Sequence, residues 1–305
     1  MKKNEIVIPA DVPPAKHETF IKNYEAITRG TGNLLLFAGD QKIEHMNKDF
    51  YGEGIHPDAQ NPEHLFKIAD RGKIGAFATQ FGLISRYCET FSNINYILKM
   101  NSKTDFIAPE EMLPRSVQMW NLGDILKVQE TSGMKARGIG YTVYLGSKDE
   151  WKMLEQAGQL TNQAHQNGMV AILWMYPRGK QVHHPRDAET VAGAAGVAAC
   201  LGADFVKVNP PIPRLGEKQA ELLRQAVEAA GNTKVICSGG EQKKPEEFLQ
   251  TVHDQIHIGG ACGAAVGRNI FQRSTKDAIA MTKAISTIVF DGKDVKTAMK
   301  ELKKS

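Results

Sequence analysis

Ala203-Asp-Phe-Val-Lys-Val-Asn-Pro-Pro211 is a short apolar run that holds one lysine, Lys207, and ends in two prolines. Similar runs lie on both sides of it at regular distances along the chain. Their ends lie at Tyr176, Lys207, Ser238 and Gly267, which are separated by 31, 31 and 29 residues. Each interval has room for one strand and one helix, so the spacing predicts repeated strand–helix units around a parallel sheet.

The rest of the chain extends this pattern to eight units. Runs rich in β-formers alternate with amphipathic helical stretches, and no segment rich in Pro, Gly or Ser divides the chain. We therefore expect α/β architecture in one domain, residues 31–305, closed as a (β/α)8 TIM barrel in preference to a doubly wound sheet. The predicted strands are Leu34–Ala38, Ala76–Gln80, Tyr96–Lys99, Gly138–Tyr144, Val170–Trp174, Phe205–Val208, Val235–Ser238 and Gly263–Val266.

Three further segments are expected to lie outside this repeat. Residues 1–30 contain three prolines and predict an amino-terminal arm or cap. Residues 41–62 and 100–114 are longer than usual connections, and long loops after barrel strands commonly shape active sites.

Composition restricts the class of partner. The net charge of +4 is small, and the lysines are spread over the 305 residues, which argues against nucleic acid and leaves a small anion possible. We find no apolar window long enough for a membrane span and no export signal, so we expect a cytoplasmic protein. The four cysteines form no CxxC pair, and Cys200, Cys237 and Cys262 are expected as small core residues.

Lys207 is the first candidate for chemistry. Alternation along the strand puts it on the same face as Phe205 and Asn209. If that face is the barrel interior, burial would lower the pKa of the lysine and supply a free amine for attack on a carbonyl. The competing interpretation is a lysine that extends to solvent at the strand end.

Trp174-Met-Tyr-Pro-Arg-Gly179 ends the preceding strand and puts Trp174 and Tyr176 on one face, with Arg178 just beyond. Beside a cationic lysine the phenolate of Tyr176 would be stabilised, so this residue could move a proton near neutral pH. Packing in the core is the alternative function of both rings.

Asp40 stands at the carboxyl end of the apolar first strand, in Asp40-Gln-Lys-Ile-Glu-His45. Its carboxylate could orient an interior lysine and accept hydrogen bonds from substrate hydroxyls. Its alternative role is to cap a turn or helix.

Two glycine-containing loops follow the last two predicted strands. Ser238-Gly-Gly-Glu241 and Gly267-Arg-Asn269 could offer backbone N–H groups to a phosphate, and Arg268 would add a bidentate cation. Each loop alone could be only a turn. His183-His184 suggests a metal site, but neighbouring residues point apart and no third ligand has a recognisable spacing, so we expect a solvated loop and no metal.

Taken in order, Asp40–His45, Trp174–Gly179, Val206–Val208, Ser238–Gly240 and Gly267–Asn269 resemble the archaeal-type class I fructose-bisphosphate aldolases over about residues 30 to 290. The resemblance implies a Schiff-base aldolase of glycolysis and gluconeogenesis that cleaves fructose 1,6-bisphosphate, needs no cofactor and forms a homo-oligomer. It implies that Lys207 forms the Schiff base and that Tyr176 donates and accepts the proton, including the one from the C4 hydroxyl. Substrate contacts would come from Asp40, Gln41, His45, Lys99, Trp174, Arg178, Ser238, Gly239, Gly240, Gly267 and Arg268.

One departure concerns the first strand, where many relatives have Asp-His-Gly and this chain has Asp40-Gln41-Lys42. The family also contains aldolases that make an amino-dideoxy-heptulosonate or act on other sugar phosphates, and these remain alternatives. A barrel that binds a phosphosugar without catalysis is a further alternative, although pure binding would need neither Lys207 nor Tyr176.

Overall fold

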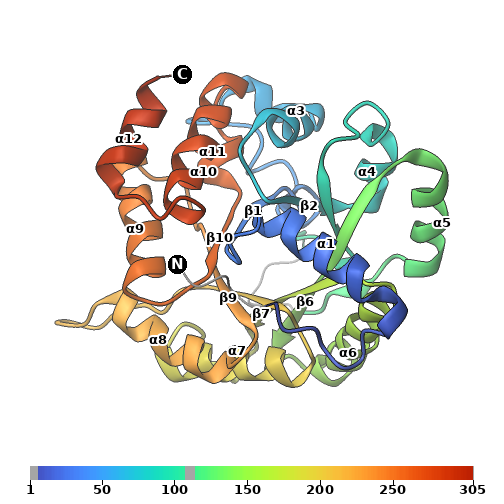
Figure 1. Ribbon diagram of the computed structural model, residues 1–305. Helices are drawn as coiled ribbons and strands as arrows, with labels where there is room; N and C mark the ends of the chain where they lie inside the picture. Colours follow the sequence, from blue (N-terminus) through green and yellow to red (C-terminus); the bar gives the residue numbers. More distant parts are fainter. Residues whose placement is uncertain (1–5, 107–113, 305) are drawn as a thin grey trace.

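Eight parallel strands close into a barrel in this computed structural model, which describes residues 6–106 and 114–304. The order around the barrel is β1-β10-β9-β8-β7-β6-β3-β2, and the helices surround it (Figure 1). The predicted (β/α)8 fold is therefore confirmed. The barrel strands are β1 (Leu34–Ala38), β2 (Ala76–Gln80), β3 (Asn95–Lys99), β6 (Lys135–Leu145), β7 (Val170–Pro177), β8 (Phe205–Val208), β9 (Lys234–Ser238) and β10 (Gly263–Val266).

Side chains of alternate positions fill two separate cores. One cluster fills the barrel interior and includes Leu36, Ile97, Trp174 and Phe205. The larger cluster lies between the strands and the outer helices. The helices that cover the barrel are α3 (Glu63–Arg71), α4 (Phe81–Tyr87), α5 (Leu122–Ser132), α6 (Glu150–Gln166), α7 (Ala188–Cys200), α8 (Gln219–Ala230), α9 (Pro245–His257), α10 (Arg268–Phe271), α11 (Thr275–Val289) and α12 (Val295–Lys303).

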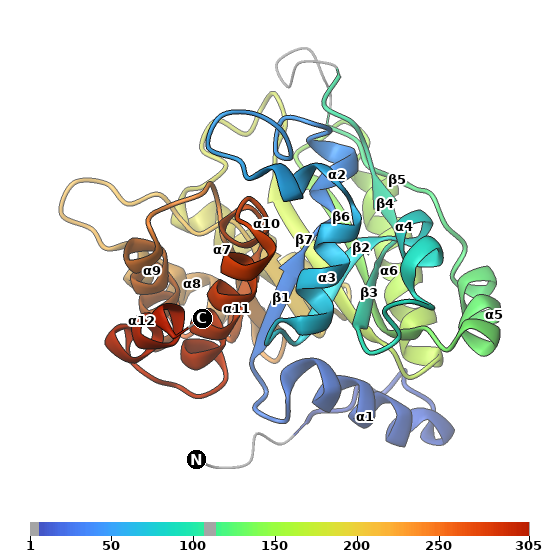
Figure 2. The same ribbon diagram turned by 90° about the horizontal axis from the view of Figure 1, so that it is seen from above.

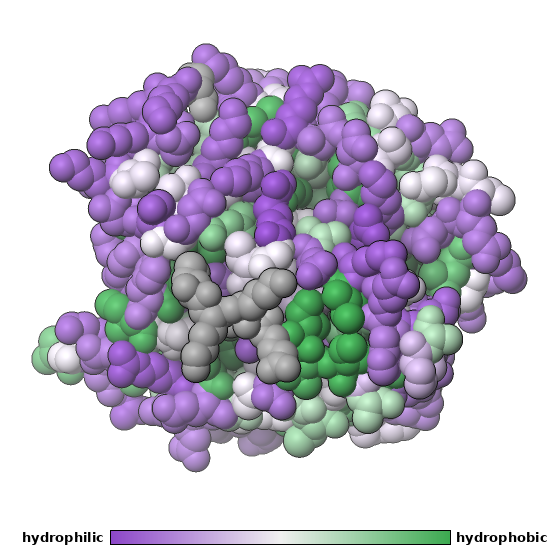
Figure 3. Space-filling view, in the orientation of Figure 1, coloured by the Kyte–Doolittle hydropathy of each residue, from purple (hydrophilic) through white to green (hydrophobic). Residues whose placement is uncertain are grey.

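The amino-terminal segment closes one end of the barrel. It contains η1 (Pro14–Lys16) and α1 (His17–Thr28), and Figure 2 shows α1 below the strands and α2 (Gln41–Glu44) above them. Phe20, Tyr24 and Ile27 of α1 are buried in the interior cluster. Hydrophilic side chains cover most of the face that carries α1 (Figure 3).

Close backbone approach explains one glycine at the closure of the sheet. Gly263 has a φ of +135°, and a Cβ there would lie 2.0 Å from the carbonyl oxygen of Leu34 on the neighbouring strand. Any other residue would push β10 away from β1, where the register pairs Leu34 with Gly263.

The two long segments contain more structure than expected. Residues 41–62 include α2 and η2 (Pro57–Gln60), so Gln41 and Lys42 belong to a short helix. The second segment contains the antiparallel pair β4 (Asn101–Ser102) and β5 (Val117–Gln118), which extends it beyond the predicted end at Pro114. The part of that predicted loop from 107 to 113 lies outside the described residues.

Candidate active site

A cavity of about 220 Å³ opens at the carboxyl end of the barrel, at the end opposite α1. It collects residues from the turn after β1, from α2, and from the strands β7, β8, β9 and β10 with the loops that follow them, as expected for a barrel enzyme. All but one of the predicted site residues line it. The lining residues are Asp40, Gln41, Glu44, His45, Trp174, Tyr176, Arg178, Lys207, Asn209, Ser238, Gly239, Gly240, Ala265, Gly267 and Arg268.

Lys207 points into the barrel, and only 4% of it is exposed. The solvated-lysine alternative is therefore wrong. Its Nζ lies 5.2 Å from the centre of the ring of Trp174, the residue opposite it on the neighbouring strand β7. Burial lowers the pKa of Lys207 from its usual value, Asp40 and Glu44 oppose this shift, and Arg268 adds to it. Within the described residues Nζ makes no hydrogen bond, which leaves the amine available as a nucleophile.

Lys99 is the predicted site residue that does not line the cavity. It is 3% exposed, and its Nζ donates to the carbonyl oxygen of Asn101 at 2.7 Å and to Asn101 Oδ1 at 2.8 Å. Burial lowers the pKa of Lys99 to about 8, with Asp40 and Glu44 opposing. Its Nζ lies 5.6 Å from the Trp174 ring centre, so Trp174 is close to both lysines. Because Lys99 is held by Asn101, it is the poorer candidate for the nucleophile.

Tyr176 lines the cavity within β7, one residue before the strand ends. The expectation of a stabilised phenolate is wrong: burial raises the pKa of Tyr176 well above its usual value, and Asp40 and Glu44 raise it further. Arg178 opposes the shift only in part. Tyr176 is therefore a neutral phenol in the free protein and is suited to donating a proton.

The first strand delivers Asp40 to the floor of the site. Asp40 is 7% exposed, its carbonyl oxygen accepts from Gln80 Nε2 at 3.0 Å, and Oδ1 is buried without a partner. The side chain makes no capping hydrogen bond to α2, so the capping alternative is wrong. His45, at the end of α2, contacts Asp49 Oδ2 through Nδ1 at 2.5 Å.

The two glycine loops meet next to this helix. The Asn269 amide donates to the carbonyl oxygens of Gly239 at 3.1 Å and Glu241 at 2.8 Å, and thereby joins them. A Cβ at Gly267 would lie 2.5 Å from Gln41 Oε1 and 2.9 Å from the carbonyl oxygen of Ala38, which excludes larger residues. The two loops are therefore joined to each other and packed against α2, so they are more than simple turns.

Four polar atoms around the cavity are buried and make no hydrogen bond within the described residues. They belong to Asp40 (Oδ1), Gln41 (Oε1), Trp174 (Nε1) and Arg268 (Nε). A buried polar atom without a partner costs about 1–3 kcal/mol, so their convergence at one cavity indicates a polar ligand that supplies the missing partners.

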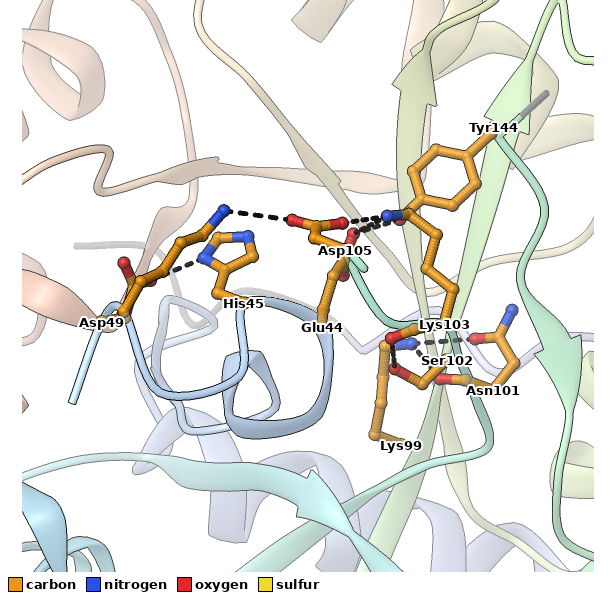
Figure 4. A network of polar contacts seen from close by, with 10 residues as sticks. Glu44, His45, Asp49, Lys99, Asn101, Ser102, Lys103, Asp105 and Tyr144 are labelled. Carbon is orange, nitrogen blue, oxygen red and sulfur yellow. Dashed lines mark hydrogen bonds and ion pairs between the residues drawn. The ribbon is translucent and has the colours of Figure 1, made fainter. Parts of the chain in front are cut away.

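Sequence reasoning missed several residues of the site. Glu44, Asn209 and Ala265 line the cavity, and Ser238 Oγ donates to Asn209 Oδ1 at 2.6 Å. Glu44 belongs to a polar network that connects α2, Tyr144 of β6 and the segment after β3 (Figure 4). The stretches Asp40–His45 and Ala203–Pro211 contain Glu44 and Asn209, but the residues that these two contact, Tyr144 and Ser238, lie far away in sequence.

Two other predictions concern residues outside the site. His183 and His184 are exposed on the loop after β7, and the described residues contain no group of three or more His, Cys, Asp or Glu that could hold a metal. Cys237 is buried and Cys262 half-buried, but Cys200 is exposed at the end of α7, so its assignment to the core is wrong.

In the described residues no helix is long and apolar enough to cross a bilayer.

Comparison with known proteins identifies the relatives of this barrel. The family model for DeoC/LacD family aldolases matches residues 34–273. The chain belongs to this aldolase family. The closed barrel and the lysine on β8 agree with membership of this family. The relatives of the chain include archaeal class I fructose-bisphosphate aldolases, which confirms the resemblance seen in the motifs.

One similar aldolase is the "fructose-bisphosphate aldolase/6-deoxy-5-ketofructose 1-phosphate synthase" of Methanocaldococcus jannaschii. It is 49% identical over 300 residues, which cover 98% of this chain and 95% of the relative. A class 1 fructose-bisphosphate aldolase of Thermoproteus tenax is 34% identical over 263 residues, 86% of this chain and 91% of the relative.

Solved aldolase structures agree in fold. Fructose-bisphosphate aldolase from Slackia heliotrinireducens superposes with a TM-score of 0.97 at 49% identity, covering 100% of this chain and 96% of that one. An archaeal fructose-1,6-bisphosphate aldolase with its catalytic lysine covalently bound to the carbinolamine intermediate has a TM-score of 0.75 at 30% identity. It covers 89% of this chain and 99% of that one.

Proposed function

We propose that this protein is a class I fructose-bisphosphate aldolase, which reversibly cleaves fructose 1,6-bisphosphate to dihydroxyacetone phosphate and glyceraldehyde 3-phosphate. The observation that carries the proposal is Lys207, a buried lysine without a hydrogen-bond partner in the described residues, on the wall of a cavity that also holds Tyr176. A relative with a covalently bound catalytic lysine supports the same chemistry.

The reaction begins when the neutral amine of Lys207 attacks the C2 ketone. Tyr176, as a neutral phenol, can protonate the carbinolamine hydroxyl so that it leaves as water and gives an iminium. The iminium accepts the electron pair of the C3–C4 bond once a base removes the C4 hydroxyl proton. Glyceraldehyde 3-phosphate then leaves, the enamine is protonated at C3, and hydrolysis releases dihydroxyacetone phosphate.

The remaining cavity residues have complementary binding roles in this proposal. Arg268 and the loops with Ser238, Gly239, Gly240 and Gly267 would hold the C1 phosphate. Arg268 Nε is buried, makes no hydrogen bond within the described residues, and has only a 3.9 Å ion pair with Asp49 Oδ2. Gln41, His45, Trp174 and Arg178 would contact the sugar and its far end. Asp40 would orient Lys207, whose pKa its charge raises.

A coupled assay tests the proposal. The purified protein should cleave fructose 1,6-bisphosphate with turnover that a chelator does not reduce, and it should form the same bond in reverse. Binding of the bisphosphate without cleavage or synthesis would contradict it and favour a non-catalytic barrel.

The name of the M. jannaschii relative supports a second product, 6-deoxy-5-ketofructose 1-phosphate. Disconnection of its C3–C4 bond gives dihydroxyacetone phosphate and methylglyoxal, so the Lys207 enamine of the first reaction could add to this second aldehyde. Incubation of the protein with dihydroxyacetone phosphate and either aldehyde separates the two activities. If dihydroxyacetone phosphate condenses with glyceraldehyde 3-phosphate and not with methylglyoxal, the second product is excluded.

We also propose that the enzyme acts in the cytoplasm as a homo-oligomer and that its amino-terminal arm closes the barrel without adding activity. Four unpaired thiols suit a reducing compartment, and the exposed Ile212 and Leu215 beyond β8 suit burial against another subunit. Light scattering of the purified protein tests the oligomeric state.

A further inference from the structure

A second cavity lies at the amino end of the barrel, where β6 begins, and we call it the amino-end cavity. Its volume is about 430 Å³, compared with about 220 Å³ for the candidate active site. Its walls come from the start of α1, the end of α5, the start of β6 and the loop between α6 and β7. The two cavities share no lining residue, so the proposed reaction gives this one no role.

Positively charged side chains dominate the lining of the amino-end cavity. Lys16 directly precedes α1, and Lys135 and Arg137 are alternate residues at the start of β6. Glu130 of α5 also borders the cavity, but it is exposed and forms no ion pair within the described residues. Three positive side chains and one negative one leave the lining with a net charge of +2.

Two helix ends border the same cavity and reduce this charge. The carboxyl ends of α5 and α6 contribute Gly133 and Asn167 to the lining. A helix carboxyl end carries about half a negative elementary charge, so the two ends together offset about one of the positive side chains. A positive excess remains.

Arg137 is half-buried and is held in one orientation by two neutral amides. Its Nε donates to Asn95 Oδ1 at 2.9 Å, and its Nη1 donates to Asn23 Oδ1 at 3.0 Å. The Asn23 amide donates in turn to the carbonyl oxygen of Gly168 at 2.8 Å, and the Asn95 amide donates to that of Gly75 at 3.2 Å. Both acceptors are therefore fixed by the backbone, and the guanidinium is fixed by them.

This guanidinium has no carboxylate partner. Within the described residues Arg137 forms no ion pair, and its Nη2 makes no hydrogen bond. Burial lowers the pKa of Arg137 without an opposing carboxylate, whereas Asp277 opposes the same shift in the half-buried Arg273. The planar donors of a guanidinium match the oxygens of a phosphate or carboxylate. A fixed cation of this kind beside a cavity is suited to an anion that the chain itself does not supply.

The remaining wall indicates the size and character of that anion. Leu126, Met134 and Met169 give the cavity an apolar side. The volume exceeds that of the candidate active site, so it has room for a carbon skeleton in addition to one phosphate group.

We propose that the amino-end cavity binds a small phosphorylated metabolite, whose phosphate pairs with Arg137, Lys135 and Lys16. The bound phosphate then links α1, which closes this end of the barrel, to β6. Because the ligand binds the folded chain, it stabilises the closed arm. The assignment does not depend on the aldolase reaction.

Pyrophosphate is the probe, because it carries the phosphate charge and has no carbonyl group for Lys207 to attack. The glycine loops and Arg268 of the candidate active site would also hold it, so binding is measured in the Arg268→Ala variant. Isothermal titration calorimetry at low salt should give a dissociation constant below about 1 mM.

Substitutions in this background locate the bound anion. Joint replacement by Lys16→Ala and Lys135→Ala should raise the dissociation constant by about tenfold or more, and Glu130→Gln should lower it by about twofold. Lys127→Ala is the matched control, because Lys127 is exposed on α5, lies outside the lining and carries the same charge. It should change the dissociation constant by no more than about twofold.

Arg137 supports both α1 and β3, so the test rests on the two lysines, whose side chains make at most one exposed hydrogen bond within the described residues. The assignment is overturned if pyrophosphate up to about 10 mM does not bind to Arg268→Ala. It is also overturned if the double lysine variant changes the dissociation constant no more than Lys127→Ala does, because binding would then depend on net charge alone. A change in Lys16→Ala that equals the control would overturn the link to α1.

Discussion

Buried charges occur at both ends of this barrel, but they are satisfied in opposite ways. At the amino end His165 is fully buried, and its ring nitrogens contact Asp11 Oδ1 at 2.8 Å and Asp204 Oδ2 at 3.2 Å. Asp204 also accepts from the N–H of Ala171 at 2.7 Å. Every polar group in this cluster therefore has a protein partner.

At the carboxyl end, Lys207 and the buried atoms of Asp40, Gln41, Trp174 and Arg268 have no hydrogen-bond partner in the described chain. Such atoms reduce stability unless a ligand pairs with them. The difference shows that the amino end is built for stability, whereas the carboxyl end gives up stability to hold an anionic polar substrate. Four predictions test this contrast.

The largest effect is expected for Lys207→Ala. Removal of the nucleophile should lower kcat/KM for fructose 1,6-bisphosphate by at least about 10⁴-fold, because the described residues that line the cavity include no other lysine that could form the iminium. Coupled-assay kinetics measures this. Lys243→Ala, on the exposed loop after β9, is the control and should retain wild-type kinetics.

The next effect concerns the amino end. His165→Ala should lower the free energy of unfolding by about 3 kcal/mol, because it leaves Asp204 buried without its cationic partner. Denaturant unfolding measures the change, and His257→Ala, an exposed histidine of α9, should stay within about 0.5 kcal/mol of the wild type. If His165→Ala lowers the free energy of unfolding no more than His257→Ala does, the cluster of His165, Asp11 and Asp204 does not stabilise the amino-terminal arm.

The stability supplied by His165 should depend on pH. Burial lowers the pKa of His165, but Asp204 and Asp11 raise it more, and its pKa lies above the usual value of 6.5. The protonated ring is therefore favoured by folding. Its contribution is complete below pH 6.5 and is lost as the pH rises through the folded pKa. The gap in Tm between the wild type and His165→Ala should narrow between pH 6 and pH 9, and a gap that widens would contradict this sign.

The smallest effect is expected for the stability of Lys207→Met. The side chain keeps its apolar stem and loses a buried cation, so the free energy of unfolding should fall by no more than about 1 kcal/mol or should increase. Thermal unfolding of this variant beside His165→Ala compares the two ends directly. If Lys207→Met lost as much unfolding free energy as His165→Ala, the two ends of the barrel would not differ in how their buried charges affect stability.

Much of the fold could be predicted from the sequence, because buried parallel strands are short apolar runs with clear ends. The bounds of β1, β2, β8 and β10 agree with the predicted ones. β6 and β7 are longer than predicted, since their pairing continues to Leu145 and Pro177. Lys135 and Arg137 start β6, and their polarity hid the start of that strand.

The residues of the site could be predicted, but not their interactions. The one-unit repeat and strand alternation were enough to bring Lys207, Tyr176 and Ser238 to one end of the barrel. Burial raises the pKa of Tyr176, and carboxylates more than 130 positions earlier in the chain, at residues 40 and 44, raise it further. The hydrogen bond between Tyr144 and Glu44 likewise joins positions 100 residues apart, and no local pattern reveals it.

The most direct test of the central claim is borohydride trapping with dihydroxyacetone phosphate, followed by peptide mapping by mass spectrometry. Lys207 and Lys99 both lie beside Trp174, but only Lys207 lines the cavity and is free of hydrogen bonds within the described chain. The account predicts one reduced adduct, on Lys207, and none in Lys207→Ala. An adduct on Lys99, or none in the wild type, would contradict it.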